Sequence, residues 1–103
     1  PIWNYEQLFS AAQVDKVTQK EAAMKKHTVV WSWIDENNGL IRARTFAPDW
    51  GIPEDEANGS GSMRLAVNLG KKLIIRHGKG SVIYARPSKF GFAEVGGRVK
   101  QKS

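Results

Sequence analysis

The feature that most constrains the fold is a strand–turn–strand pattern in residues 28–46. Residues 28–34 (TVVWSWI) are rich in β-branched and aromatic side chains, and residues 40–46 (LIRARTF) alternate apolar with charged ones. Both patterns are typical of β-strands. Residues 35–39 (DENNG) between them have the composition of a tight turn. The sequence therefore predicts an antiparallel hairpin near the middle of the chain.

Two segments have helical character. Residues 4–26 place apolar side chains at roughly helical spacing without proline or glycine, but the pattern weakens at residues 15–20, which leaves two short helices as an alternative. Residues 60–69 also have helical spacing, and Gly70 is a typical helix stop. This second helix is apolar on most sides, so we expect it to be buried at the centre of the fold.

The order of the elements indicates the fold class. Three further strands are predicted at residues 72–76, 81–86 and 90–95. A helix, a hairpin, a loop over residues 47–58, a helix and three strands make an α+β arrangement in which a sheet covers one or two helices. Residues 100–103 are expected to fray. A chain of 103 residues has room for one such domain.

Composition excludes several kinds of site. The chain has no cysteine, which rules out a disulfide framework, a thiolate metal site and a cysteine nucleophile. Its two histidines lie far apart in the sequence and do not favour a metal site. No apolar run approaches the ~20 residues that span a bilayer, and no signal peptide is visible. We therefore expect a cytoplasmic protein that neither enters the membrane nor holds a metal.

The net charge of +6 is unevenly distributed. Residues 71–103 carry nine lysines or arginines and one acid, whereas residues 35–56 carry six acids and two arginines. A basic carboxyl-terminal third is typical of a phosphate or nucleic-acid surface, and also of a solvated sheet face. Because the basic residues form no compact run, the pattern does not favour nucleic acid as the partner.

Residues 53–62 (PEDEANGSGS) contain the best candidate for a binding site. Three adjacent acids, which repel one another, stand just before a glycine-rich helix start. Glycine lets a ligand approach the backbone closely, and a helix start offers N–H donors and the positive end of its dipole. These donors can hold a carboxylate while Asp55 accepts a hydrogen bond or moves a proton. The donors belong to Gly59, Ser60, Gly61 and Ser62.

An ordinary structural explanation of this segment stays open. Asparagine and serine before a helix are common capping residues, and acids there interact favourably with the helix dipole. The segment also lacks the lysine of a phosphate-binding loop and the full spacing of a dinucleotide fingerprint. The local pattern alone therefore does not decide between a cap and a ligand site.

A longer pattern around the same segment resembles a known family. Residues 44–60 (RTFAPDWGIPEDEANGS) resemble the signature of the phenazine-biosynthesis-like (PhzF-type) isomerases, which reads roughly R-x-F-A-P-x-x-G-I-x-E-D-P-A-T-G-S. Three later stretches resemble closing segments of the family in the same order: residues 77–81 (HGKGS), 85–87 (ARP) and 95–99 (VGGRV). The likeness covers residues 28–99, whereas residues 1–27 match only loosely.

The resemblance implies the fold of diaminopimelate epimerase, in which two lobes enclose the active site. Each lobe is a mixed, mostly antiparallel sheet wrapped around a central helix. Residues 1–103 would then be a single carboxyl-terminal lobe, with residues 60–69 as its central helix. The implied chemistry is cofactor-free proton transfer in a small carboxylated metabolite. Because the family's general base is a glutamate of the amino-terminal lobe, this chain would need a second lobe, from a separate chain or from a homodimer.

The resemblance also assigns roles to residues. By position, Asp55 matches the acidic residue that lines the site, and Gly59 and Ser60 match the helix start that binds the substrate. Glu54, beside Asp55, is a further candidate to contact the substrate. So is His77, a polar turn residue at a position where the family often has glutamine.

The chain departs from the family signature at two positions. Glu56 replaces the usual proline, and Asn58 replaces the usual threonine. Because proline would stiffen the loop, we expect Glu56 to add charge and freedom at the mouth of the site and to disfavour an anionic substrate. Arg44 is expected to neutralise Glu54 or Asp55.

A non-catalytic protein is the alternative. In that case the chain would be a binding or assembly module that uses its basic carboxyl-terminal face to contact nucleic acid or a protein.

Overall fold

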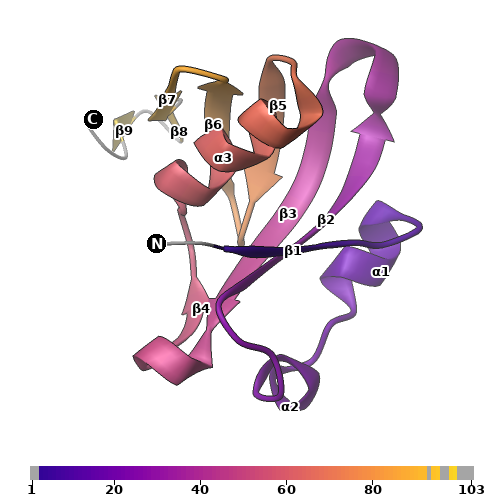
Figure 1. The fold of residues 1–103 in the computed structure, drawn as a ribbon, viewed down its shortest axis with the longest axis vertical. Coiled ribbons are helices and arrows are strands. Elements are labelled where there is room, and N and C mark those ends of the chain that lie inside the picture. Colours follow the sequence, from indigo (N-terminus) through magenta and orange to yellow (C-terminus); the bar gives the residue numbers. More distant parts are fainter. Residues whose placement is uncertain (1–2, 93, 96–97, 100–103) are drawn as a thin grey trace.

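The structure, a computed structural model, describes residues 3–92, 94–95 and 98–99, so the expected fraying of residues 100–103 lies outside the described residues. The first half of the chain forms β1 (Asn4–Gln7), α1 (Ala11–Asp15), α2 (Gln19–Ala22), β2 (Thr28–Asp35), the 3₁₀ helix η1 (Glu36–Asn38), β3 (Leu40–Ala47) and the 3₁₀ helix η2 (Pro48–Trp50). The second half forms β4 (Ile52–Asp55), α3 (Gly59–Leu69), β5 (Leu73–His77), β6 (Ser81–Arg86), β7 (Lys89–Phe92), β8 (Glu94–Val95) and β9 (Arg98–Val99). The α+β class is confirmed (Figure 1).

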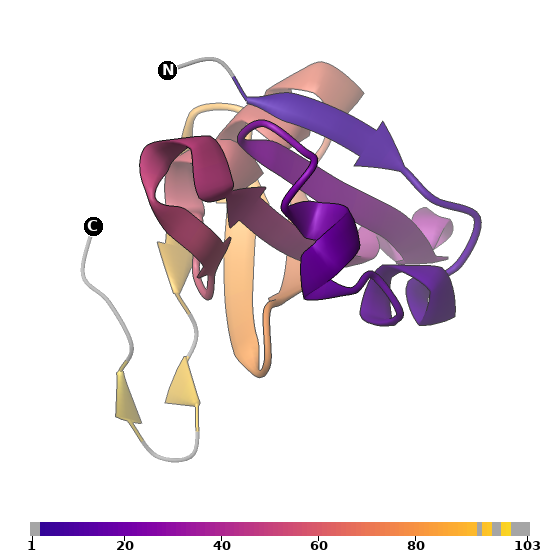
Figure 2. The same ribbon diagram turned by 90° about the horizontal axis from the view of Figure 1, so that it is seen from below.

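The strands form one mixed sheet with the order β1-β2-β3-β5-β6-β7, and β4 pairs with β3 outside this path. The β1–β2 and β3–β5 pairs are parallel, and the other pairs are antiparallel, including the predicted β2–β3 hairpin. Figure 1 shows α3 on one side of the sheet and α1 and α2 beside β2 on the other. Figure 2 shows the short β8–β9 pair set apart from the main sheet. The mixed, mostly antiparallel sheet is therefore confirmed.

The amino-terminal segment differs from the single long helix predicted for residues 4–26, and that prediction is wrong. Its first residues form β1, which pairs in parallel with β2. Tyr5 packs against the core and donates a hydrogen bond from its hydroxyl to the carbonyl oxygen of Gly61 at 2.8 Å. The Ser10 and Thr18 side chains cap the starts of α1 and α2, which divides the remaining segment into the two short helices of the alternative. Tertiary contacts thus override the local helical pattern.

The helix α3 agrees with its prediction in extent but is buried on one side. It ends at Gly70, which adopts the left-handed conformation (φ 67°) expected at a helix stop. Its buried residues form one stripe that includes Leu65 and Ala66, whereas Val67 is 42% exposed. Within the described ranges, no helix combines the length and the apolar character needed to cross a bilayer.

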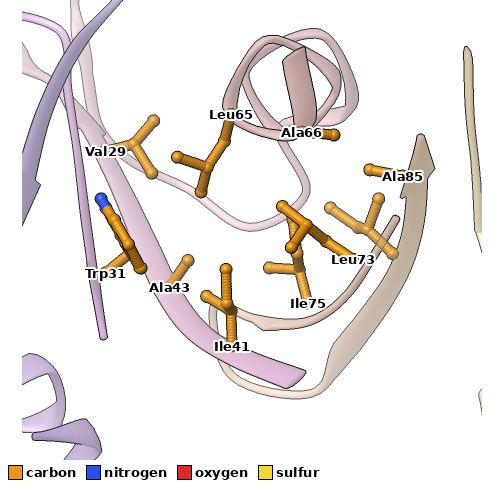
Figure 3. Packing of buried hydrophobic residues seen from close by; sticks show 10 residues of the cluster. Val29, Trp31, Ile41, Ala43, Leu65, Ala66, Leu73, Ile75 and Ala85 are labelled. Carbon is orange, nitrogen blue, oxygen red and sulfur yellow. The ribbon is translucent and has the colours of Figure 1, made fainter. Parts of the chain in front are cut away.

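The main hydrophobic core lies between α3 and the sheet. Figure 3 shows Leu65 and Ala66 of α3 facing side chains from β2, β3, β5 and β6. Because side chains alternate along a strand, Val29 and Trp31 of β2 join this core while Val30 faces α1 and α2. The smaller cluster on that opposite face consists of Val14, Ala22, Val30 and Phe46. Both faces of β2 and β3 are therefore covered.

Gly39, which ends η1, is expected to tolerate no side chain. Its φ is +69°, and an added Cβ would lie 2.5 Å from the backbone oxygen of Lys72. We expect Gly39→Ala to lower the free energy of unfolding by about 2 kcal/mol, from the strained φ and the displaced backbone. Gly51 has a similar φ of +79° and open space around it, so Gly51→Ala should cost about 1 kcal/mol. Equal losses in urea unfolding would contradict the role of the close contact.

Candidate functional site

The segment predicted as a loop over residues 47–58 contains η2 and the short strand β4, so the prediction of a continuous loop is wrong. β4 pairs with the second half of β3, where Asp55 lies opposite Thr45. The first half of β3 pairs with β5, where Ala43 lies opposite His77. Because β2 occupies the other edge of β3, β4 and β5 lie end to end along the same edge. The residues after β4 therefore meet the turn that joins β5 to β6.

Glu54 is held by Arg44. The Nε and Nη2 atoms of Arg44 donate to the two carboxylate oxygens of Glu54, each at 3.0 Å. The Nη1 atom of Arg44 donates to the carbonyl oxygens of Val14 and Val17 at 3.0 and 2.9 Å, so this side chain also fixes the end of α1. The expected neutralisation is confirmed for Glu54. Because neighbouring strand residues face opposite sides, Glu54 points away from the face that Asp55 shares with Thr45.

Asp55 lies on the same side of the sheet as α3. Residues paired across antiparallel strands share a face, and Thr45 continues the row of Ile41 and Ala43 that packs under α3. The carboxylate of Asp55 is half-buried and accepts a hydrogen bond from the N–H of Ala57 at 3.1 Å. This bond tightens the segment that leads into α3. Asp55 therefore lies next to residues 56–58, which lead into the start of α3.

The start of α3 is capped by Asn58. Its Oδ1 atom accepts a hydrogen bond from the N–H of Gly61 at 2.8 Å, and its backbone oxygen accepts one from the N–H of Ser62 at 3.1 Å. Asn58 is thus an ordinary N-cap. Two of the four amides that we expected to hold a ligand are used by the chain itself, and Gly59 and Ser60 remain as the candidate donors.

The two remaining positions differ in accessibility. Gly59 is buried under the ring of Phe90, because an added Cβ would lie 2.2 Å from the Cε2 atom of that ring. Ser60 is exposed. The side chain of Asn58, which is 4% exposed, leaves its Nδ2 donor without a hydrogen-bond partner among the described residues. Because buried donors are rarely left without a hydrogen bond, the Nδ2 group of Asn58 favours the binding of an acceptor atom at the helix start.

His77 is the last residue of β5 and is 1% exposed, so the prediction that it lies in the turn is wrong. Its Nδ1 atom lies 2.6 Å from the carbonyl oxygen of Glu56, and its Nε2 atom lies 2.7 Å from the hydroxyl of Thr45. Because a carbonyl only accepts hydrogen bonds, Nδ1 carries the proton and Nε2 accepts from Thr45. Burial lowers the pKa of His77, which keeps the ring neutral at pH 7.

Glu56 is fixed by the turn between β5 and β6. Its carboxylate accepts hydrogen bonds from the N–H groups of Lys79 and Gly80 and from the hydroxyl of Ser81. Desolvation opposes ionisation of Glu56, but these donors outweigh it and lower the pKa of its carboxyl. The prediction that Glu56 adds conformational freedom at the mouth of the site is therefore wrong. Its charge is already balanced by hydrogen bonds from the chain.

The contact between Glu56 and the turn was missed by the sequence analysis. A signal was present, since two glycines in residues 78–81 allow successive backbone N–H groups to point to one side. The partner could not be identified, because Glu56 lies more than 20 residues away in the chain and no local spacing relates the two.

A second polar cluster, also missed, lies at η2. The Nδ1 atom of His27 is 2.7 Å from Asp49, and the ring of His27 stacks on Trp50 with centroids 4.3 Å apart. Trp3 contacts the edges of both rings. The cluster joins the start of β2 to η2, which gives His27 a structural role.

The stability of the protein is expected to fall on acidification because of His77. Its pKa in the folded protein is below the 6.5 of the unfolded chain, so the unfolded chain binds more protons between these values. Asp55 and Glu56 near the ring favour its protonation and Arg42 opposes it, but burial dominates. The free energy of unfolding should therefore decrease from about pH 7 to about pH 5. The variant His77→Gln should not show this decrease in the free energy of unfolding. If the free energies of the variant and of the parent chain changed in parallel with pH, the decrease would not come from His77.

Compared with known protein families, the chain matches none. Within the described residues, no group of three or more histidine, aspartate or glutamate side chains is arranged to hold a metal ion. The polar groups at this site are Asp55, Asn58 and the start of α3.

Proposed function

We propose that the chain is the carboxyl-terminal lobe of a PhzF-like isomerase, which transfers a proton on a small carboxylated metabolite without a cofactor. The observation that carries the proposal is the position of Asp55 beside a helix start whose cap, Asn58, has a buried donor without a partner among the described residues. The resemblance of residues 44–60 to the family signature supports it. The protein would act in the cytoplasm.

The geometry supports a proposed role for each of these residues. The exposed start of α3 at Ser60 and the Nδ2 donor of Asn58 would bind the substrate carboxylate, helped by the helix dipole. Asp55 would orient the substrate or exchange its proton. Neutral His77 is shielded from solvent and acts by holding Thr45 and the backbone of Glu56 in place. Proton transfer at carbon needs groups on both faces of the substrate, so the second lobe, from another chain or from a homodimer, would supply the other group.

The test measures binding and exchange separately. ¹⁵N NMR of the chain, titrated with a set of small amino and hydroxy acids, should show saturable shifts at Gly59 and Ser60 for at least one of them. The same mixtures in deuterated water should show no efficient C–H exchange by the monomer. Efficient exchange by the monomer would contradict the need for a second lobe, and an absence of shifts at residues 59–60 for every acid would contradict the site.

Asp55→Asn gives the matched test of the proposed acid. In any two-lobed assembly that exchanges substrate protons, this variant should slow the exchange by about 100-fold, because it removes the proton acceptor while keeping the shape of the side chain. Glu36→Gln removes an exposed charge in η1 and should leave the rate unchanged. Equal rates for the Asp55 variant and the parent chain would refute the role of Asp55.

A second candidate function rests on the outer face of β5 and β6. Ile74 and Tyr84 lie opposite each other in the sheet and are 36% and 52% exposed. Three basic residues on the same two strands or beside them are also exposed: Lys72, Arg76 and Arg86. An aromatic ring among cations is typical of single-stranded nucleic-acid surfaces. Steeply salt-dependent binding in a titration would favour this function, and an absence of binding at low salt would exclude it.

A further inference from the structure

The turn formed by residues 78–81 directs several donors at one carboxylate. The N–H of Lys79 lies 2.8 and 2.9 Å from the two oxygens of Glu56, and the N–H of Gly80 lies 3.1 Å from one of them. The hydroxyl of Ser81 donates to the same oxygen at 3.1 Å. Successive backbone donors converging on one point form an anion-binding nest. The turn therefore has the geometry of an oxyanion site, and its occupant is a side chain of the protein.

The turn is held in this shape by contacts that do not involve Glu56. The N–H of Gly78 donates to the carbonyl oxygen of Ala43 at 3.0 Å, and His77 pairs with Ser81 at the end of the β5–β6 ladder. Gly78 has φ +62°, and an added Cβ would lie 2.4 Å from the carboxylate of Glu56. The sheet thus sets the direction of the donors, and glycine leaves room for an anion beside them.

A positively charged groove lies beside the turn. A groove of about 410 Å³ is lined by all four turn residues together with Arg42 and Arg76. The Nε atom of Arg42 lies 2.6 Å from Asp15, so its charge is partly balanced, whereas Arg76 and Lys79 are exposed. Glu56 is itself exposed. Because Glu56 is exposed, a dissolved anion can reach its carboxylate from solvent, and the nearby charges of Arg76 and Lys79 favour an anion there.

We propose that residues 78–81 form a binding site for small oxyanions, carboxylate or phosphate, and that Glu56 fills this site as a tethered ligand. An external anion that displaces the Glu56 carboxylate frees the segment between β4 and α3 from one of its attachments. The inference does not depend on the isomerase assignment, since it concerns the turn alone. A tethered group competes at an effective concentration of about millimolar or more, so external anions bind weakly while Glu56 is present.

The test removes the tethered ligand. In ¹⁵N NMR titrations at constant ionic strength, inorganic phosphate and acetate should each be added to the parent chain, Glu56→Ala and Glu36→Ala. The Glu36 variant is the matched control, because it raises the net charge equally but keeps Glu56 in the nest. We expect Glu56→Ala to bind at least one of the anions with a Kd at least about tenfold lower than the other two proteins, with saturable shifts at Lys79 and Gly80. The probe that binds more tightly, phosphate or acetate, identifies whether the site prefers a phosphate or a carboxylate.

Equal affinities for the Glu56 and Glu36 variants, or shifts confined to other residues, would overturn the proposal. A measurement on the parent chain covers the case in which Glu56→Ala does not fold. The ¹³C signal of the Glu56 carboxyl should titrate at a higher pH in concentrated phosphate than in sodium chloride of equal ionic strength, because displaced Glu56 loses its donors. An unchanged titration in phosphate and in acetate would also overturn the proposal.

Discussion

Arg44→Ala is expected to lower the free energy of unfolding by about 3 kcal/mol, since removing one partner of a largely buried ion pair leaves the other charge uncompensated. The side chains of Arg44 and Glu54 are 13% and 16% exposed and are joined by two hydrogen bonds. The variant also removes the hydrogen bonds that Arg44 donates to the carbonyl oxygens of Val14 in α1 and of Val17 beyond its end. Urea unfolding followed by tryptophan fluorescence measures the loss.

Two further variants separate the causes of this loss. Arg42 also pairs with an acid, Asp15, but that carboxylate is 56% exposed, so Arg42→Ala should cost about 1 kcal/mol or less. The double variant Arg44→Ala with Glu54→Gln removes the uncompensated charge and should recover part of the stability. If Arg44→Ala cost no more than Arg42→Ala, the proposed anchoring of α1 and β4 by Arg44 would be wrong.

His77→Ala should also cost about 3 kcal/mol, because it creates a cavity and leaves two polar groups without their partner. The ring is 1% exposed and bridges the hydroxyl of Thr45 and the carbonyl oxygen of Glu56. Thr45 belongs to β3, Glu56 follows β4, and His77 itself ends β5. The ring therefore joins three segments of the chain. Thermal and urea unfolding at about pH 7.5, where His77 is neutral, measure the effect without a contribution from protonation.

Thr45→Val is the matched control for His77. It removes one of the two hydrogen bonds and keeps the shape of a fully buried side chain, so it should cost about 1 to 2 kcal/mol. Amide hydrogen exchange adds a local measurement. In the His77 variant, exchange should increase for residues 55–57 and 79–81 more than in β2. A uniform increase across the sheet would indicate loss of packing alone.

The parts of the fold that were predicted correctly depend on local signals. The β2–β3 hairpin follows from alternation on both sides of a turn, and the end of α3 follows from Gly70. The prediction failed for β1, whose pairing with β2 depends on residues 24 positions away, such as Asn4 and Thr28. It also failed for β4, which contains Pro53. Proline is compatible with a strand that is paired on one edge, and such a short strand has no periodicity of its own.

The candidate site shows the same division. An ion pair of Arg44 with Glu54 or Asp55 was predicted from opposite charges, and the structure has the pair with Glu54. The cap at Asn58 was predictable from residue type. The use of the Gly61 and Ser62 amides by Asn58, and the attachment of Glu56 to the β5–β6 turn, were not predictable. Both depend on where the backbone directs its N–H groups, which the identity of a side chain does not reveal.

The end-to-end arrangement of β4 and β5 along β3 has an evolutionary consequence. The ladder of β4 ends at Asp55 and that of β5 ends at His77, so the junction between them is bridged by side chains rather than by continuous strand pairing. Substitutions at position 56 can therefore change how this junction is closed while the sheet stays intact. Replacements at this one gap can therefore accumulate in an otherwise unaltered scaffold.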